Sequence, residues 1–288
     1  MYGNLVIAYL FLGGAAAGGF FAMAAWSLLA RRSEHSPRHN RAFESLRSRM
    51  YVVCLVMLVF ALVMLLWDLE YPQKALLVFL RPHATAITFG AYSLAALAIL
   101  GTLLVLGSLF RFRLGGARSR RAFETLCCVL SIAVMAYTGI FLAGNPAVAF
   151  WNTAWLVALF VCSSLSCGIS LLLLVDYFIK DQTLLLRAAR PMQACHLTCL
   201  AAEAASLALF VSAAFRNPDA NDAWALLLSP DMLPIAVVGA IGFGIVVPAV
   251  LETYAITRKE CRTIPVSDAI CLCGGLCLRY CVIVCGIQ

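Results

Sequence analysis

The stretch LVIAYLFLGGAAAGGFFAMAAWSLLA, residues 5–30, contains no charged side chain. At a rise of about 1.5 Å per residue, a helix of this length is long enough to cross the roughly 30 Å hydrocarbon core of a membrane. Gly14 and Gly18 lie four residues apart, on one face of such a helix. Small residues at this spacing let two helix backbones approach closely. The stretch therefore predicts a closely packed transmembrane helix.

Seven more apolar stretches of similar length follow along the chain. Hydrophobic residues make up 63% of the sequence and charged residues only 12%, which leaves little chain for a soluble domain. Inside hydrocarbon the backbone must satisfy its own hydrogen bonds, so each stretch is predicted to be a helix. We predict an all-α integral membrane protein with eight transmembrane helices, at approximately 5–30, 50–67, 84–110, 123–143, 150–178, 194–215, 232–256 and 266–286.

A second pair of small residues, Ser164 and Gly168, lies near the start of the second half of the chain. It has the same spacing as the pair in the first helix, and both favour close contact between helices. Because one such pair occurs early in each half, we expect two four-helix bundles, formed by residues 1–143 and 144–288.

Lysines and arginines are distributed unevenly among the seven connections between these helices. Of the 21 basic residues, 17 lie in the first, third, fifth and seventh connections, three in the others and one, Arg279, in the last helix. Positive charge is enriched on the cytoplasmic side of membrane proteins, so both termini are predicted to be extracytoplasmic. The net charge of +7 is thus a topology signal and gives no reason to expect nucleic-acid binding. The start of the chain lacks the charged region of a cleaved secretory signal, so we expect the first helix to be retained.

Polar side chains collect at the outer ends of the first four predicted helices. Tyr137 lies about six to eight residues, roughly 10 Å, below the outer end of its helix. Tyrosine and histidine can bond the ring oxygens of a quinol, and aspartate or histidine can carry protons away. We therefore predict a quinol site, with Tyr137, His83 and Asp68 in the chemistry and Tyr137, Tyr9, Tyr92, Asn145 and Trp67 in quinone binding.

Several of these residues also fit simpler roles. Trp67 and Tyr9 fit the aromatic belt at a membrane surface. His83 follows a proline and fits an interfacial loop, and Asp68 fits a solvated helix end. Tyr137 lies below the usual depth of the belt, which makes it the strongest candidate of the set.

Three motifs resemble the NrfD-like, polysulfide-reductase membrane-subunit family. They are AYLFLGGAAAGGFF at 8–21, YTGIFLAGNPAVAFWNTAW at 137–155 and LRYCVIVCG at 278–286. The resemblance implies a multi-pass subunit of a prokaryotic cytoplasmic membrane that exchanges electrons between a menaquinone- or ubiquinone-type quinol and an extracytoplasmic [4Fe–4S] ferredoxin-like subunit. It also implies a molybdopterin or multihaem catalytic partner. The tyrosine that lines the family's quinone pocket corresponds to Tyr137.

The sequence itself favours a chain without haem, cluster or metal. A transmembrane dihaem cytochrome needs facing histidine pairs within its helices. Here His35 and His39 fall in a predicted loop, His83 at the outer edge and His196 at the inner edge. The cysteine-rich run CLCGGLCLRYCVIVC has neither ferredoxin nor haem-attachment spacing, so we interpret its cysteines as packing residues.

The uncharged connection at 137–155 is expected to separate two helices and to offer a docking surface. Gly144, Asn145 and Pro146 are expected to end the fourth helix, and Trp151 with Asn152 to begin the fifth. Such an apolar surface at the outer face is suited to the docking of an iron–sulfur partner.

Two charged residues lie deep in the second half, Glu203 in the sixth predicted helix and Arg279 in the eighth. A charge at mid-membrane is costly, so each needs a partner or a hydrated cavity. We predict that the two interact, as a proton path or as a structural ion pair. Asp176 and Glu252 are interpreted as ordinary solvated helix ends, although they also suit an extension of such a path.

Two other functions compete with the quinol-linked subunit. A secondary transporter would have broken helices and inverted repeats, for which Pro234 and Pro248 around GAIGFG give limited support. A structural anchor without a working quinone site is the third possibility.

Overall fold

The computed structural model describes residues 4–29, 37–68, 85–109, 117–178, 182–257 and 265–287. All regular structure in these ranges is helical. The elements are α1 (Asn4–Leu29), α2 (Pro37–Asp68), α4 (Ala86–Leu109), α5 (Ala117–Ala143), α6 (Ala154–Tyr177), α7 (Gln182–Phe215), η3 (Pro218–Ala220), α8 (Asn221–Leu227), η4 (Ile235–Val246), α9 (Val247–Thr257) and α10 (Pro265–Ile287).

Eight helical segments in the described ranges are long and apolar enough to cross a membrane, which confirms the predicted all-α class. They are Leu5–Leu29, Asn40–Asp68, Ala86–Ser108, Arg118–Ala143, Ala154–Tyr177, Pro191–Phe215, Ile235–Thr257 and Pro265–Ile287. Three helices, α2, α5 and α7, begin several residues before the predicted starts. Their first turns are polar, and hydropathy alone does not detect a helix that continues beyond the hydrocarbon.

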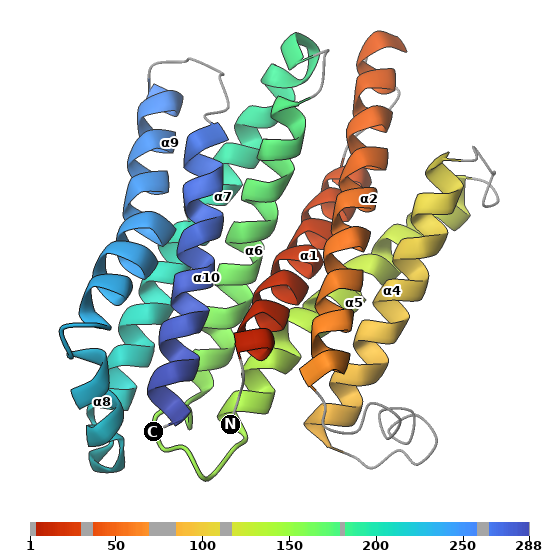
Figure 1. The fold of residues 1–288 in the computed structure, drawn as a ribbon. Helices are drawn as coiled ribbons and strands as arrows, with labels where there is room; N and C mark the ends of the chain where they lie inside the picture. Colours follow the sequence, from red (N-terminus) through yellow and green to blue (C-terminus); the bar gives the residue numbers. More distant parts are fainter. Residues whose placement is uncertain are drawn as a thin grey trace.

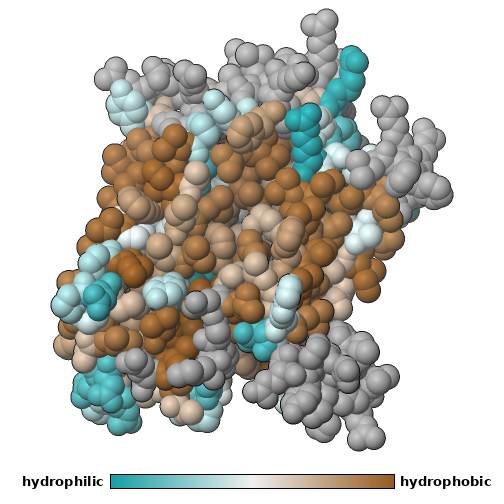
Figure 2. Space-filling model, in the orientation of Figure 1, coloured by the Kyte–Doolittle hydropathy of each residue, from teal (hydrophilic) through white to brown (hydrophobic). Residues whose placement is uncertain are grey.

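The described chain begins and ends at the same end of the helix assembly, as an even number of crossings requires (Figure 1). We call this the termini end, and we call the opposite end, which carries Arg47 and Arg120, the basic end. Apolar side chains cover the middle of the face drawn in Figure 2, whereas hydrophilic ones lie nearer the two ends. Which end faces the cytoplasm stays a prediction from the charge distribution.

Helices α1 and α6 lie at the centre of the assembly. Helix α1 packs against α2, α5, α6 and α10, and α6 packs against α1, α5, α7 and α10. A Cβ atom added to Gly18 would lie 1.9 Å from the carbonyl oxygen of Ser164, and one added to Gly168 would lie 2.1 Å from the carbonyl carbon of Gly18. The two backbones are therefore in direct contact, through the small residues that the sequence indicated.

Buried apolar side chains form two clusters. The first joins residues of α1, α2, α4 and α5 to part of α6. The second joins the start of α6 to α7, α8, η4 and α10. The proposed division into bundles at residues 143 and 144 stays a prediction, because α1 and α6 contact helices of both halves.

Helix η4 is a π-helix over Ile235–Val246 and continues directly into α9. Pro248 follows two residues after η4 and has no amide hydrogen for an intrahelical bond, a feature that commonly perturbs the preceding turn. A Cβ on Gly274 of α10 would lie 2.1 Å from Cα of Gly244, so η4 and α10 also meet backbone to backbone. The segment between Pro234 and Pro248, for which the sequence allowed a broken helix, is continuous and has the wider π-helical form.

Candidate functional site

Four aromatic residues of the predicted quinol site divide into a buried pair and an exposed pair. Tyr9 and Tyr137 are 4% and 7% exposed, and both belong to the first apolar cluster. Trp67 and Tyr92 are 79% and 43% exposed. All four lie toward the termini end, but only the tyrosines on α1 and α5 are enclosed by other helices.

Tyr137 is held by a glycine on the neighbouring helix. Its ring lies over Gly90 of α4, where an added Cβ would be 2.3 Å from the ring atoms Cδ2 and Cε2. Any larger residue at position 90 would displace the ring, so Gly90 leaves the space that the phenol ring occupies. Tyr137 lies six residues before the end of α5, which corresponds to a depth of about 9 Å.

Tyr9 has a buried hydroxyl with no hydrogen-bond partner among the described residues. Its ring packs beside Gly13 of the same helix, and Ala61 of α2 lies near that glycine. A buried polar group without a partner costs about 1–3 kcal/mol. The Tyr9 side chain therefore does not fit the aromatic belt, and its hydroxyl has unused hydrogen-bonding capacity among the described residues.

The other predicted residues of this site differ in position. Asp68 is the last residue of α2 and is half-buried. The Asn145 side chain accepts a hydrogen bond from the backbone amide of Ala147 at 3.2 Å and so stabilises the turn after α5. His83 lies outside the described residues.

The fifth helix begins later than predicted. Helix α6 starts at Ala154, and its N-cap Thr153 accepts a hydrogen bond from the amide of Trp155 at 3.4 Å. Trp151 lies in the preceding turn, fully buried, and its indole nitrogen donates to the carbonyl of Val282 at 2.8 Å. The hydrogen bond from Trp151 thus fixes the connection between the halves to α10. The helix begins only after Thr153, which supplies its N-cap.

A second set of polar side chains runs through the interior of the second half, and we call it the polar seam. Its members are Ser163, Ser164, Ser166 and Ser170 of α6, His196 and Glu203 of α7, Glu252 of α9, and Asp268, Cys271 and Arg279 of α10. All of them are buried. From Asp268 to Arg279 the seam covers about 16 Å of helix axis.

Arg279 occupies the end of the seam nearest the membrane centre. Its guanidinium donates to Ser164 Oγ at 2.8 Å, to Ser163 Oγ at 3.2 Å and to the carbonyl oxygen of Gly275 at 3.0 Å. It also lies over the rings of Phe11 and Phe160, at 5.7 and 5.5 Å from their centroids. Hydroxyls, a carbonyl and aromatic faces therefore solvate this cation.

Glu203 interacts with the same group of side chains. Its carboxylate is influenced by the Arg279 charge and by the Ser163 and Ser166 hydroxyls. Among the described residues no direct ion pair joins Glu203 to Arg279, and Ser163 contributes to the surroundings of both. One carboxylate oxygen of Glu203 has no hydrogen-bond partner within the described ranges.

The seam ends toward the basic end in a buried histidine and two carboxylates. His196 bonds Glu252 through Nδ1, and its Nε2 lies 3.1 Å from both Ser166 Oγ and Ser170 Oγ. Donor atoms of His196, Glu252 and Asp268 lie within 4.8 Å of one another. The arrangement can hold a proton, and its donor set can also contact a cation.

The interpretation of Asp176 and Glu252 as solvated helix ends was wrong, since both side chains are buried inside the protein. Sequence position near a helix end gave no information about the helices packed around it. His196 was missed for the same reason. Its spacing of seven residues from Glu203, which places both on one face of a helix, was a usable signal.

The fold defines a multi-pass membrane protein with buried polar groups inside its helix assembly. The sequence matches the family described as "Polysulphide reductase, NrfD" over residues 1–288, and the chain therefore belongs to the NrfD family. It is a prokaryotic multi-pass membrane subunit of a polysulphide reductase-type, multisubunit respiratory complex. A comparison with curated individual proteins gave no significant match.

Proposed function

We propose that this chain binds and oxidises a quinol at the termini end of α1, α2, α4 and α5. The observation that carries the proposal is the enclosed Tyr9 hydroxyl, which has no partner among the described residues, in the same apolar cluster as Tyr137. A quinol head group needs hydrogen-bonding groups at its ring oxygens and apolar walls around its ring and tail. Two phenols in an apolar cluster meet both needs, and family membership supports a quinone-interacting subunit.

Each residue has a defined role in this reaction. Oxidation of a quinol to a quinone releases two electrons and two protons. Tyr9 and Tyr137 hold the ring oxygens, and Gly90 keeps the Tyr137 ring in place. Asp68 at the end of α2 and His83 accept protons at the outer surface. Trp67 and Tyr92, both exposed, contact the tail as it enters from lipid.

The electrons pass to a partner subunit. Family membership supports a docked [4Fe–4S] subunit at the extracytoplasmic face as the acceptor of the electrons, and the sequence has no facing histidine pairs for a dihaem cytochrome. A molybdopterin or multihaem subunit behind it carries the terminal chemistry. The uncharged turn around Asn145 contributes to the docking surface.

Turnover of the purified complex with a menaquinol analogue tests the proposal. We expect Tyr137→Phe and Tyr9→Phe each to lower quinol oxidation by about 10- to 100-fold and to reduce the quinone that co-purifies, because each removes one hydrogen bond to the reacting ring.

Tyr51→Phe is the matched control for both variants. Tyr51 belongs to the same apolar cluster and also has a buried hydroxyl without a partner among the described residues, but it lies toward the basic end. It should retain turnover. Equal losses in all three variants would show a packing effect and would remove the case for a site at the termini end.

We further propose that the polar seam carries protons, with Glu203 and Arg279 in its inner section. The observation that favours this role is the series of buried hydroxyl, imidazole and carboxyl groups between Arg279 and Asp268. In reconstituted vesicles, Glu203→Gln should lower the proton release per quinol oxidised, leaving only the release through Asp68 and His83. Unchanged release in that variant would leave Glu203 and Arg279 as a structural pair.

A further inference from the structure

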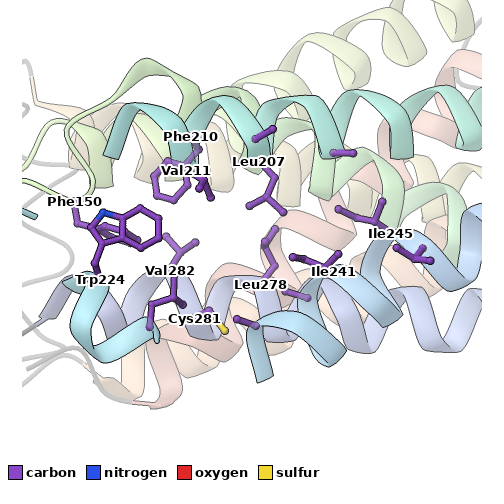
Figure 3. Close-up of a pocket in the computed structure, with 16 residues that line it drawn as sticks. Phe150, Leu207, Phe210, Val211, Trp224, Ile241, Ile245, Leu278, Cys281 and Val282 are labelled. Carbon is purple, nitrogen blue, oxygen red and sulfur yellow. The ribbon is translucent and has the colours of Figure 1, made fainter. Parts of the chain in front are cut away.

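An apolar cavity opens between α7, η4, α8 and α10, and none of its lining residues belongs to the polar seam or is Tyr9 or Tyr137. Its volume is about 460 Å³, within the range of about 300–1,000 Å³ typical of ligand pockets. On α7 its lining runs from Ala204 to Val211, which is about 10 Å along the helix axis. Figure 3 shows Trp224 and Phe150 at one end of the cavity and Ile245 at the other, with α7 and α10 on opposite sides. The cavity is therefore elongated along the helices.

The lining contains one strong hydrogen-bond donor, at the termini end of the cavity. The indole nitrogen of Trp224 is buried and has no hydrogen-bond partner among the described residues. The indole ring is held edge-on by Phe150 and Phe215, with ring centroids 5.9 and 5.8 Å apart. The lining is otherwise apolar except for the Cys281 thiol, a weak donor. The indole nitrogen lies on the side of the Trp224 ring away from the rest of the cavity (Figure 3), so it would meet a single acceptor oxygen beyond the end of an apolar chain in the slot.

We propose that this cavity binds one acyl chain of a phospholipid, whose ester carbonyl accepts a hydrogen bond from Trp224. The chain belongs to a membrane protein, so phospholipid is the molecule that surrounds this cavity. Tryptophan near a membrane surface commonly lies at the depth of lipid carbonyls, with its ring in the apolar layer and its N–H toward polar groups. Arg216, exposed and adjacent to Phe215, supplies a cation for the phosphate.

The polar content of the lining favours a lipid over a quinone head group. A quinone ring presents two carbonyl oxygens, and burying both requires two partners. This cavity offers a single strong donor at its end and apolar side chains along its length. An acyl chain needs no partner below its ester group.

The π-helix shapes one wall of the cavity. Ala236, Ala240 and Ile241 of η4 all line it, and the contact between Gly244 and Gly274 fixes η4 against α10. A π-helix has more residues per turn than an α-helix and occurs frequently at functional sites. The small alanine side chains leave the space that the acyl chain fills.

Photocrosslinking in the purified, intact complex tests this inference. The complex is reconstituted into bilayers containing a phosphatidylcholine with a diazirine on one acyl chain, and labelled peptides are identified by mass spectrometry. We expect adducts on residues 204–211 and 278–282. Ala208→Phe, which fills the slot, should abolish them, and Trp224→Phe should reduce them by about fivefold through loss of one hydrogen bond.

Ala205→Phe is the matched control, because Ala205 is exposed on α7 and does not line the cavity. It should leave labelling unchanged. Equal labelling in Ala208→Phe and Ala205→Phe would overturn the inference, since it would report only lipid around the protein. Co-purified quinone that is lost specifically in Ala208→Phe would also overturn it, by assigning the cavity to an isoprenoid tail. Neither result depends on quinol turnover at Tyr137.

Discussion

The tyrosine site, formed by Tyr9 and Tyr137, buries neutral groups, whereas the polar seam buries charged ones. Tyr9 and Tyr137 are neutral and lie in an apolar cluster, and the Tyr9 hydroxyl has no partner among the described residues. The seam contains charged groups, and Arg279 alone makes three hydrogen bonds. The two regions share α1, where Tyr9 and Gly14 are five residues, about 7.5 Å, apart, and Gly14 lies against Ser164 and Arg279.

The two regions differ in the cost of burying their polar groups without hydrogen-bond partners. A charge within a membrane is costly to leave without partners, and Arg279 and His196 each have several in the seam, although one carboxylate oxygen each of Glu203 and Glu252 and Nε of Arg279 have none among the described residues. A neutral phenol costs less to bury and can remain without a partner until a molecule with an acceptor arrives. The contrast supports the proposal that the tyrosine site binds the quinol and that the seam carries protons.

The strongest test of this contrast removes the cation of the seam. Arg279→Met should lower the free energy of unfolding by about 3–5 kcal/mol, because it leaves Glu203 in the membrane without its electrostatic partner. The measurement is the unfolding midpoint of the purified protein in detergent. The double variant Arg279→Met/Glu203→Leu should recover some of the loss. A double variant as unstable as the sum of the single variants would show that the two charges do not act together.

The joint between α1 and α6 should respond next most strongly. In Gly18→Ala the new methyl group would collide with the Ser164 backbone, which cannot move as a side chain can, so we expect a loss of about 1–3 kcal/mol in unfolding free energy. Gly13→Ala is the control, because its nearest neighbours would be 3.8 and 3.9 Å away. If both variants behave alike, direct backbone contact at Gly18 is not what stabilises the joint.

A smaller effect is expected when the Tyr137 ring is displaced while its hydroxyl is retained. Gly90→Ala places a methyl group against the ring, and quinol turnover of the complex should fall by about tenfold because the phenol leaves its position. Combining Gly90→Ala with Tyr137→Phe should add little to the effect of Tyr137→Phe alone. Full turnover in Gly90→Ala would show that the ring position is not critical.

The smallest effect is expected where the seam has two equivalent hydroxyls. Ser166 and Ser170 both lie 3.1 Å from Nε2 of His196. Ser170→Ala should therefore cost about 0.5 kcal/mol, since Ser166 still serves the ring nitrogen. The double variant Ser166→Ala/Ser170→Ala should cost about 1–3 kcal/mol, because His196 then loses both partners on that side. Thermal unfolding of the two variants distinguishes a shared contact from two independent ones.

The helices were predictable because hydropathy reports directly on the need to bury apolar surface. The stretch at 5–30 and its glycine pair anticipated both α1 and its backbone contact with α6. The start of α6 was misplaced because Trp151 is apolar, and only the structure shows that its indole bonds Val282 before the helix begins. The alternating direction of the helices along the chain predicted that Tyr9 and Tyr137 lie toward the same end of the assembly.

The seam was harder to predict, because its contacts join helices that are distant in sequence. His196 and Glu252 are 56 residues apart, and neither position alone indicates the other. The burial of Asp176 and Glu252 depends equally on packing between helices, which hydropathy does not report. Sequence reasoning found the costly mid-membrane charges, Glu203 and Arg279, but not the groups that surround them.

The bare-backbone contact between Gly18 and Gly168 also has a consequence for mechanism. A transporter that works by alternating access must move one rigid group of helices against another to open first one side and then the other. Helices whose main chains touch directly have no flexible side chains between them to accommodate such rocking. This contact at the centre of the assembly therefore counts against a rocking motion between α1 and α6.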